Sequence, residues 1–422
     1  MHGVQHLHFR LSAQGSGVQT AGEGIAMAHV VRVGLVGAGF VAGIHARSFK
    51  RIRDIDVQLK AVAAIPQSAA QTFAESFGIS DVYEDYRRIL DRDDIDVVDL
   101  CVPNNLHEAF AIEAAEAGKH IICEKPLTGC FGVPESAATN QRLKRLMFAE
   151  AVKSADRIIN AAHKAGVKLM YAENWLYCPA VQKAVRLVRA SKGTIFEVRA
   201  QECHSGSHAT YAKEWKYAGG GSLIRLAPHP IAAAIYLKQE EALARNEEPP
   251  GVTSVTAEVG DLSRMSSFQR EEPKWVVADW QDVENWGIVL MTFEDGSRAV
   301  ISASDIVLGG MEDTLQVFMS NARIDCDLTH SGMMKAYAAD SVVFSEEYIM
   351  EKVGTKSGWC YPSIDEEWLL GYPQEIRDFI EAVAFDRKPL ATAELGHQVV
   401  KVIYAAYLSA EEGRRVDLAE PF

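Results

Sequence analysis

A short apolar run that leads directly into a glycine-rich turn limits the possible folds of this chain more than any other segment. Residues 30–36 (VVRVGLV) are typical of a buried parallel strand, and residues 37–42 (GAGFVA) precede a stretch with helical spacing. In such a turn the first glycine permits the tight bend, and the second lets the backbone approach a pyrophosphate. The free N–H groups and the dipole of the helix N-terminus favour the anion. We therefore expect this loop to bind a nicotinamide dinucleotide through Gly37, Gly39, Phe40 and Val41.

The first part of the chain alternates strand-like and helix-like segments. This alternation predicts an α/β fold whose N-terminal Rossmann domain, residues 28–172, contains a doubly wound parallel sheet. Residues 1–27 are rich in Gly, Ser, Gln and His and lack the apolar centre of a signal peptide, so we interpret them as a disordered leader. Further strands are expected at 59–65, 95–102, 120–123 and 167–172, with helices at 41–49, 69–77, 86–90, 108–117 and 148–165.

A different pattern covers residues 173–422. Long strands, few helices and an Asp295-Gly296 turn between two apolar runs predict hairpins and a large, open, mostly antiparallel sheet. We expect this C-terminal α/β domain to bind substrate and to form oligomers, with its last helices packing back on the first domain. Strands are expected at 194–202, 252–259, 286–293, 298–303, 315–319 and 322–327, helices at 374–385 and 392–412, and surface loops at 239–250 and 261–273.

Composition and charge exclude several classes of partner. The net charge of −14 disfavours binding to nucleic acid or to an anionic membrane surface, and no apolar run approaches the length that spans a bilayer. The seven cysteines are odd in number and form no Cys-x-x-Cys pair, which indicates reduced thiols and a cytoplasmic protein. We expect no metal site: His204 and His208 are four residues apart, but no helix is expected there and a third ligand is lacking.

The end of the second expected strand leaves the choice of cofactor open. A carboxylate there would hold the ribose hydroxyls of NAD, and a nearby arginine would accommodate the 2′-phosphate of NADP. This tip reads AAIP over residues 63–66, which makes uncharged Ala64 the expected contact. Either NAD or NADP fits this pattern, and NAD is favoured because the tip has no cation for the extra phosphate.

Several further motifs occur together. Residues 102–107 (VPNNLH) and 124–126 (EKP) each follow a strand, residues 219–223 (GGGSL) lead to His229, and residues 409–416 (SAEEGRRV) lie near the end. With the glycine turn, these motifs resemble those of the Gfo/Idh/MocA oxidoreductases, the family of glucose-fructose oxidoreductase and inositol dehydrogenase, over nearly all of the chain. The resemblance implies hydride transfer between NAD(P) and a hydroxyl of a small sugar or polyol. It also implies a homodimer or homotetramer, because the open sheet often forms the subunit interface in this family.

The resemblance implies roles for individual residues as well. Lys125 and His229 are the expected catalytic residues, since a neutral histidine can act as a general base and the lysine of the Glu-Lys-Pro motif helps to move the proton. Beyond the glycine loop and Ala64, the expected cofactor contacts are Pro103, Asn104, His107, Glu124 and Lys125. The expected substrate contacts are Lys125, Asn174, His204, Tyr211, Arg225 and His229.

Arg225 is the position where this chain departs from the family pattern. The family has Asp four residues before the catalytic histidine, and here that position holds an arginine, which can accept neither a proton nor a hydrogen bond. Three alternatives stay open: Arg225 clamps an anionic substrate, it pairs with a nearby acid, or the protein has left standard dehydrogenase chemistry. His229, between Pro228 and Pro230, has its own alternative as a buried structural histidine.

Three functions follow from these observations. The leading hypothesis is an NAD(P)-dependent oxidoreductase acting on the CH–OH group of a sugar, cyclitol or glycoside, an anionic one if Arg225 is a clamp. The second is a family member with tightly bound NAD that performs lyase-type chemistry through transient oxidation. The third is a non-catalytic, dinucleotide-binding regulatory protein, which the change to Arg225 favours.

Overall fold

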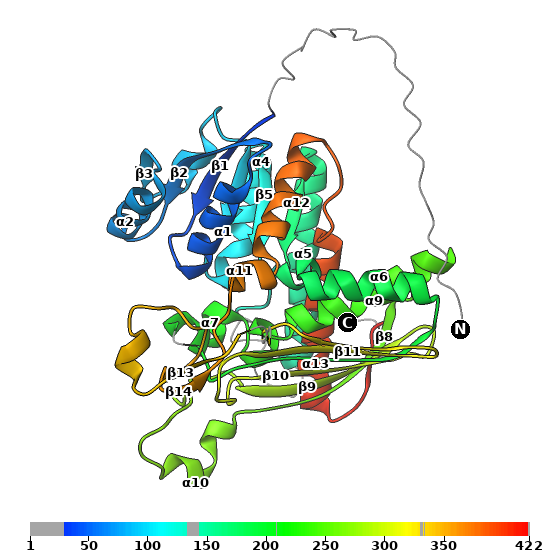
Figure 1. The fold of residues 1–422 in the computed structure, drawn as a ribbon. Coiled ribbons are helices and arrows are strands. Elements are labelled where there is room, and N and C mark those ends of the chain that lie inside the picture. The colour runs from blue at the N-terminus through cyan, green and yellow to red at the C-terminus, as the bar shows by residue number, and fades with distance from the viewer. Residues whose placement is uncertain (1–28, 133–142, 208, 330–331, 333, 421–422) are drawn as a thin grey trace, which may run out of the picture.

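A parallel sheet and a mixed sheet, each covered by helices, dominate the structure (Figure 1). The computed structural model describes residues 29–132, 143–207, 209–329, 332 and 334–420. The expected leader at 1–27 and His208 lie outside these residues. Within the described part, no helix combines the length and the apolar character that crossing a membrane requires.

The first sheet is parallel throughout, with the strand order β3-β2-β1-β4-β5-β6. This order confirms the predicted doubly wound Rossmann sheet, whose ligand crevice lies at the carboxyl ends of β1 and β4, where the order reverses. The elements are β1 (Val30–Val36), α1 (Phe40–Arg51), β2 (Asp56–Ala63), α2 (Gln67–Phe77), β3 (Asp81–Tyr83), α3 (Arg87–Leu90), β4 (Val97–Leu100), η1 (Asn104–Leu106), α4 (His107–Glu116), β5 (His120–Glu124), α5 (Leu143–Ala165) and β6 (Leu169–Ala172).

The second sheet has seven strands in the order β12-β11-β7-β10-β9-β8-β15. Neighbours β7 and β10 run parallel and the other pairs antiparallel, which confirms the predicted open, mostly antiparallel sheet. Its strands are β7 (Ile195–Cys203), β8 (Val252–Gly260), β9 (Trp286–Phe293), β10 (Arg298–Ser304), β11 (Glu312–Met319), β12 (Arg323–Asp327) and β15 (Val416–Asp417), and a separate hairpin pairs β13 (Ala336–Ala338) with β14 (Gly358–Cys360).

The helices of this half are more extensive than the sequence pattern predicts. The α-helices are α6 (Pro179–Ser191), α7 (Trp215–Ala218), α8 (Ser222–Arg225), α9 (Pro228–Arg245), α10 (Ser266–Gln269), α11 (Glu366–Leu369), α12 (Tyr372–Ala384) and α13 (Ala393–Glu412). The 3₁₀ helices are η3 (Asn174–Tyr177), η4 (Thr210–Lys213), η5 (Leu262–Arg264) and η6 (Ser341–Phe344).

Two loop predictions in this half are wrong. The segment expected as a loop at 239–250 is helical as far as Arg245, because its polar residues are buried and paired rather than solvated. Lys238 forms an ion pair with Glu241, and Glu240 pairs with Arg189. The segment at 261–273 contains the short helices η5 and α10.

Helices α6 and α9 lie along the face of the mixed sheet that is turned toward the Rossmann sheet (Figure 1). Alternate residues of β7 and β11 point to this face, and the apolar ones, such as Val198 and Leu315, are fully buried. This packing brings the N-terminus of α9 to the carboxyl ends of β5 and β6, since His229 of α9 contacts Glu173 just beyond β6.

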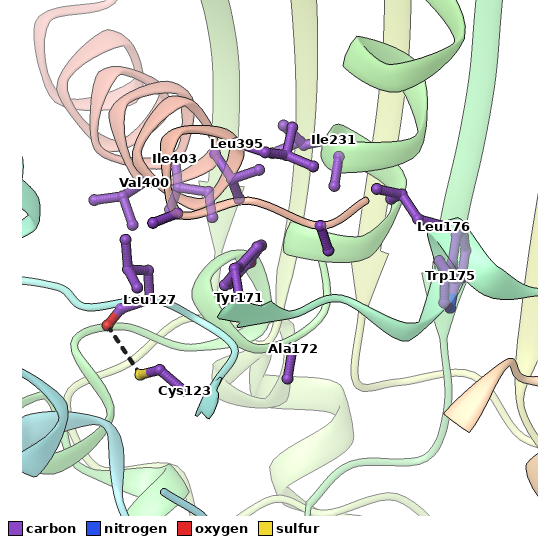
Figure 2. Packing of buried hydrophobic residues seen from close by; sticks show 14 of the residues in the cluster. Cys123, Leu127, Tyr171, Ala172, Trp175, Leu176, Ile231, Leu395, Val400 and Ile403 are labelled. Atoms are coloured by element: carbon purple, nitrogen blue, oxygen red, sulfur yellow. Dashed lines mark hydrogen bonds between the residues drawn. The ribbon is translucent and has the colours of Figure 1, made fainter. Parts of the chain in front are cut away.

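One apolar cluster continues between the two sheets. Figure 2 shows Val400 and Ile403 of α13 packed beside Leu127, which follows β5, and Tyr171 of β6. Helix α13 also lies against α5 and β8, so it contacts elements of both sheets. Trp175, labelled in Figure 2, belongs to the same cluster, and its ring stacks on that of His229 at the start of α9.

Candidate functional site

The turn between β1 and α1 has the open backbone that a pyrophosphate requires. Gly37 has φ of +110°, and a Cβ there would lie 2.1 Å from the carbonyl oxygen of Cys101, so a side chain does not fit. Gly39 is the N-cap of α1, no side chain caps this helix, and a Cβ on Gly39 would meet nothing within 4 Å among the described residues. No described side chain therefore caps the N-terminus of α1 or crowds Gly39, which leaves room for a dinucleotide pyrophosphate at the first amides of the helix. Phe40, 68% exposed, and partly buried Val41 begin this helix.

The tip of β2 carries no charge in the structure either. Ile65 is 82% exposed, and the amide of Ala64 donates to the carbonyl oxygen of Tyr83 at 3.2 Å. Helix α2 begins directly afterwards with Gln67 and Ser68. The adenosine side of the crevice thus has neutral polar groups for a ribose.

The loop after β4 is anchored to the rest of the protein by two of the expected cofactor residues. Asn104 Nδ2 donates to the carbonyl oxygen of Ala218 at 2.8 Å. The ring nitrogens of His107 lie 2.8 Å and 3.0 Å from the carbonyl oxygens of Pro126 and Val102, and burial lowers the pKa of this histidine. These side chains hold the loops after β4 and β5 together, and Pro103 lies partly buried between them.

Three buried polar residues, Asp99, His45 and Glu124, contact one another in series at the start of the Glu-Lys-Pro segment. His45 Nδ1 is 3.0 Å from Asp99 Oδ2, and His45 Nε2 is 3.1 Å from Glu124 Oε1. Burial opposes a charge on His45, but Asp99 and Cys101 raise its pKa well above the ordinary value. Burial likewise opposes ionisation of Glu124, but the hydrogen bond and charge of His45 lower its pKa. Glu124 is therefore ionised, and its Oε2 accepts the amide of Lys125 at 3.0 Å.

The ligand-type atoms of His45, Asp99 and Cys101 lie within 4.8 Å of one another, the one such group among the residues that the structure describes. Hydrogen bonds within the group account for this proximity, since His45 Nδ1 binds Asp99 and the Cys101 thiol lies 3.5 Å from both. The expectation of no metal site stays a prediction.

Lys125 reaches across the crevice from the end of β5. Its Nζ donates to the carbonyl oxygen of Arg225 at 2.6 Å, which ties the lysine to helix α8. A lysine ammonium has three donors, so two are available for other groups. Lys125 is partly buried.

His229 is buried at the start of α9 and has a carboxylate partner that the sequence pattern did not predict. Its Nδ1 lies 2.5 Å from Glu173 Oε1, and its ring stacks on Trp175 with centroids 5.8 Å apart and planes 12° apart. With Glu173 accepting from Nδ1–H, the other ring nitrogen keeps its lone pair. The sequence does contain a feature that indicates Glu173 as a site residue, because it is the first residue after β6 and so lies at the carboxyl edge of the sheet.

Arg225 pairs with an acid, which was one of the three alternatives for this position. Its Nη2 donates to Asp305 Oδ2, and its guanidinium lies 5.0 Å from the ring centroid of Trp280. Burial raises the pKa of Asp305 to about 6, although Arg225 opposes this shift. His204 Nδ1 lies 3.4 Å from the same carboxylate and accepts the amide of Gly206 at 2.9 Å. Asp305 is thus a second acid that the sequence pattern missed.

The remaining expected substrate residues differ in position. Tyr211, in η4, is 39% exposed. Burial raises the pKa of Tyr211, and the charge of Arg225 opposes this increase, so the tyrosine lies near the arginine. Asn174 is buried, and its Nδ2 donates to the carbonyl oxygen of Leu370 at 2.8 Å. The structure therefore brings Tyr211 to the group around Arg225, while the side chain of Asn174 holds the turn before α12.

Glu202, at the end of β7, joins the two expected catalytic residues. Its Oε2 lies 3.8 Å from Nε2 of His229. Burial raises the pKa of Glu202, while the charges of His229 and Lys125 oppose the increase. Because both residues lie close to this one carboxylate, Lys125 and His229 converge on the same space.

The fold and the crevice define a dinucleotide-binding oxidoreductase. The model for the oxidoreductase family NAD-binding Rossmann fold (GFO_IDH_MocA) matches residues 31–173, and that for the family's C-terminal α/β domain matches residues 191–418. The chain therefore belongs to the Gfo/Idh/MocA oxidoreductase family, as the sequence motifs predict.

Named relatives and a solved structure agree with this membership. The chain is 25% identical over 392 residues to the myo-inositol 2-dehydrogenase of Thermotoga maritima, which covers 92% of this chain and 99% of that protein. It is 30% identical over 288 residues to the levoglucosan dehydrogenase of Pseudarthrobacter phenanthrenivorans, which covers 65% and 67%. The crystal structure of GenD2 from gentamicin A biosynthesis in complex with NAD matches with a TM-score of 0.75 at 25% identity, over 96% of this chain and 99% of that one.

Proposed function

We propose that this protein transfers a hydride between NAD(P) and one hydroxyl-bearing carbon of a sugar, cyclitol or glycoside. The observation that carries the proposal is the convergence of Lys125 and His229 beside Glu202, at the carboxyl edge of a dinucleotide-binding sheet. Relatives named for inositol and levoglucosan support a polyhydroxylated ring as substrate.

The cofactor would be held by backbone rather than by charge. The amides at the start of α1 and the open space at Gly39 suit the pyrophosphate, and Pro103 and Lys125 flank the position for the nicotinamide. When bound, the dinucleotide supplies the acceptor for the hydride that leaves the substrate carbon. NAD is the proposed cofactor in preference to NADP, because the tip at Ala64 and Ile65 offers no cation.

The residues of the chain would move the proton. Glu173 accepts from Nδ1 of His229, so the Nε2 lone pair can take the proton of the substrate hydroxyl as the carbon–oxygen double bond forms. The imidazolium that results is stabilised by the Glu173 carboxylate. Lys125, with one donor engaged by the Arg225 carbonyl, can donate to the substrate oxygen and hold it in line with His229. In the reverse direction His229 returns the proton.

An anionic substrate is not proposed. The Arg225 guanidinium pairs with Asp305 through Nη2 and lies over the ring of Trp280, so its charge is already compensated by a carboxylate of the protein. Acids in the site outnumber the cations that face it, which disfavours a second negative charge.

A dinucleotide-reduction screen tests the proposal. Neutral sugars, cyclitols and uronic acids are each offered with NAD and with NADP, and a neutral ring should reduce NAD while uronic acids gain no advantage. Tight dinucleotide binding without reduction by any compound would contradict the proposal in favour of a regulatory protein. A burst of cofactor reduction without net accumulation would contradict it in favour of lyase-type chemistry.

We also propose that the protein is a cytoplasmic homodimer or homotetramer. The outer face of the mixed sheet exposes Phe196, Ile288 and Leu290, an apolar surface that a second copy can cover. The seven cysteines are free and six are buried, which suits a reducing compartment. Light scattering of the purified protein measures the assembly, and a monomer at micromolar concentration would contradict it.

A further inference from the structure

Two carboxylates occupy positions of the mixed sheet where its own pattern calls for apolar side chains. On β7, the residues that face α9 are Val198, Ala200 and then Glu202. On β11, Asp313 comes first on the same face, ahead of Leu315. Register pairs Asp313 directly with Glu202, and directly opposed residues of antiparallel strands point to the same side. The two acids therefore form a pair on the buried face of the mixed sheet, at the end of the sheet that borders the candidate site.

Among the described residues, no lysine or arginine forms an ion pair with either acid, and the nearest ring nitrogen, Nε2 of His229, lies 3.8 Å from Oε2 of Glu202. Asp313 has no exposed surface and Glu202 has 5%. Both oxygens of Asp313 and Oε2 of Glu202 are buried without a hydrogen-bond partner among the described residues. An unpartnered buried carboxylate is costly, so such a group calls for an occupant that the folded chain does not itself supply.

The other charged groups facing the pair do not compensate it. Glu202 lies near His229 and Lys125, but also near Glu173 and Glu351. The charged groups with the largest effect on the pKa of Asp313 are all acidic, namely Glu202, Glu351, Glu366 and Asp327, and each raises it. Burial raises the pKa of both carboxyl groups, and Glu202 raises that of Asp313 further. Ionisation of both carboxyl groups is therefore unfavourable unless a cation lies beside them.

We propose that Glu202 and Asp313 bind an ammonium group on the substrate, so that the preferred substrate is an amino sugar or an amino-substituted cyclitol. This inference rests on the proposed oxidation of a ring hydroxyl and names the substrate class for it. An ammonium brings three donors and the compensating charge, whereas a hydroxyl brings one donor and no charge. The distance of 3.8 Å from Glu202 Oε2 to His229 Nε2 puts the amine on the same ring as the hydroxyl that reacts.

A divalent metal is a poorer occupant than an ammonium. Among the described residues, the group with at least three ligand atoms close enough to share an ion is His45, Asp99 and Cys101, which does not include Glu202 or Asp313. Divalent cations of the hard type take six or more oxygen ligands, and two carboxylates alone leave most of that shell unfilled. An ammonium needs only the acceptors that the pair provides.

Matched substrates test the inference. Sugars and cyclitols are compared that carry an amino, a hydroxyl or an acetamido group at the same ring position, with the NAD-loaded protein. The amine should have a kcat/KM at least about tenfold above its hydroxyl and acetamido counterparts, because a charge-assisted contact replaces a neutral one. Isothermal titration in two buffers of different ionisation enthalpy should show that a proton is released when the amine binds.

Three variants assign the effect to the pair. Asp313→Asn should lower the ratio of kcat/KM for the amine to kcat/KM for its hydroxyl counterpart by about tenfold, which removes the preference for the amine. Glu202→Gln gives a second isosteric test if Asp313→Asn does not fold. Glu312→Gln is the matched control, because Glu312 is the neighbouring acid on β11, is exposed on the opposite face and binds Gln201. It should retain the preference.

The outcomes separate this inference from the proposed function. Oxidation of neutral sugars without any preference for amines in the natural protein would overturn the ammonium site and leave the dehydrogenase proposal intact. Amine binding with proton release but no cofactor reduction by any sugar would support the site and overturn the dehydrogenase. Thermal stabilisation by Mg²⁺ or Mn²⁺, lost in Asp313→Asn and not reproduced by amines, would overturn the ammonium site in favour of a metal.

Discussion

The contact between Glu173 and His229 gives the sharpest prediction about catalysis. Glu173→Gln keeps a side chain of the same length and an acceptor for Nδ1–H but removes the charge that stabilises the imidazolium. The pair is buried with 2.5 Å between Oε1 and Nδ1, so the contact is a charge-assisted hydrogen bond. Such bonds contribute about 1.5–3 kcal/mol, and every 1.36 kcal/mol is a tenfold change in rate. We expect kcat to fall roughly 10- to 150-fold.

The expected fall in kcat comes from the proton-transfer step alone, in which positive charge develops on His229. Substrate and cofactor bind before His229 is protonated, so KM and the dinucleotide affinity of Glu173→Gln should stay within about threefold of the natural values. Glu173→Asp, which keeps the charge at a shorter reach, should recover part of kcat. Steady-state kinetics with one substrate from the screen and titration of cofactor fluorescence provide these values.

A variant at Asp378 serves as a control, because it tests whether a fall in kcat can come from a less stable fold rather than from a mispositioned His229. Asp378 accepts hydrogen bonds from the Tyr177 hydroxyl at 2.7 Å and the Leu390 amide at 2.8 Å, in the same layer but away from His229. Asp378→Asn should lower the free energy of unfolding by about 1 kcal/mol or more and leave kcat unchanged. If Glu173→Gln instead retains full kcat, or loses it only in proportion to the fraction unfolded, Glu173 does not position the base.

Three further predictions concern the cofactor side. Gly39→Ala should fold normally and bind the dinucleotide at least about tenfold more weakly. Gly37→Ala should instead lose about 2–4 kcal/mol of unfolding free energy, because its Cβ would lie 2.1 Å from the Cys101 carbonyl oxygen. Denaturant unfolding and cofactor titration distinguish the two variants, and equal behaviour would contradict the roles given to the two glycines. Ile65→Arg should lower the KM for NADP relative to NAD, since it adds a cation at the exposed tip of β2, and an unchanged ratio of the two values would contradict that placement of the ribose. The folded pKa of His45 is raised above its ordinary 6.5, so its stabilisation is fully present below that pH and is lost as pH rises through the folded pKa. Unfolding measured from pH 6 to pH 10 should therefore show a decline that is absent in His45→Gln, and parallel curves for the two proteins would contradict a charged His45.

Local patterns predicted the fold well where each element depends mainly on its own sequence. The apolar run at 30–36, the glycine turn and the Asp295-Gly296 hairpin have signatures that neighbouring residues determine, and the structure has each of them. Helix α9 was not predicted, and a loop was expected at 239–250, where the helix ends, because the polar residues there, such as Glu240 and Glu241, look solvated in sequence. Glu240 is buried against Arg189 of α6, and Glu241 accepts the amide of Ile195 at the start of β7 as well as pairing with Lys238 of its own helix; a linear pattern does not identify the contacts from α6 and β7.

The residues of the candidate site also fall into two groups, those that the sequence indicates and those that only the fold brings into place. Lys125 and His229 stand in motifs of fixed spacing, so the sequence singles them out. Glu173 and Asp305 gain their roles from residues 56 and 80 positions away in the chain, and this pairing depends on how the two sheets pack. The side chain of Arg225 illustrates the difference: the sequence shows that a cation has replaced an acid, and only the fold supplies Asp305 as its partner.

The reduction of NAD by the Lys125→Met variant tests the proposed chemistry most directly. Methionine keeps an unbranched side chain as far as the ε position and removes the ammonium donors that reach the Arg225 carbonyl and the substrate oxygen. The natural protein and the variant are mixed rapidly with NAD and the best substrate of the screen, and reduced cofactor is followed by absorbance. We predict unchanged affinity for the dinucleotide and a loss of reduction to below about one part in a hundred. Reduction by the variant at the natural rate would contradict the role given to Lys125 and, with it, the mechanism.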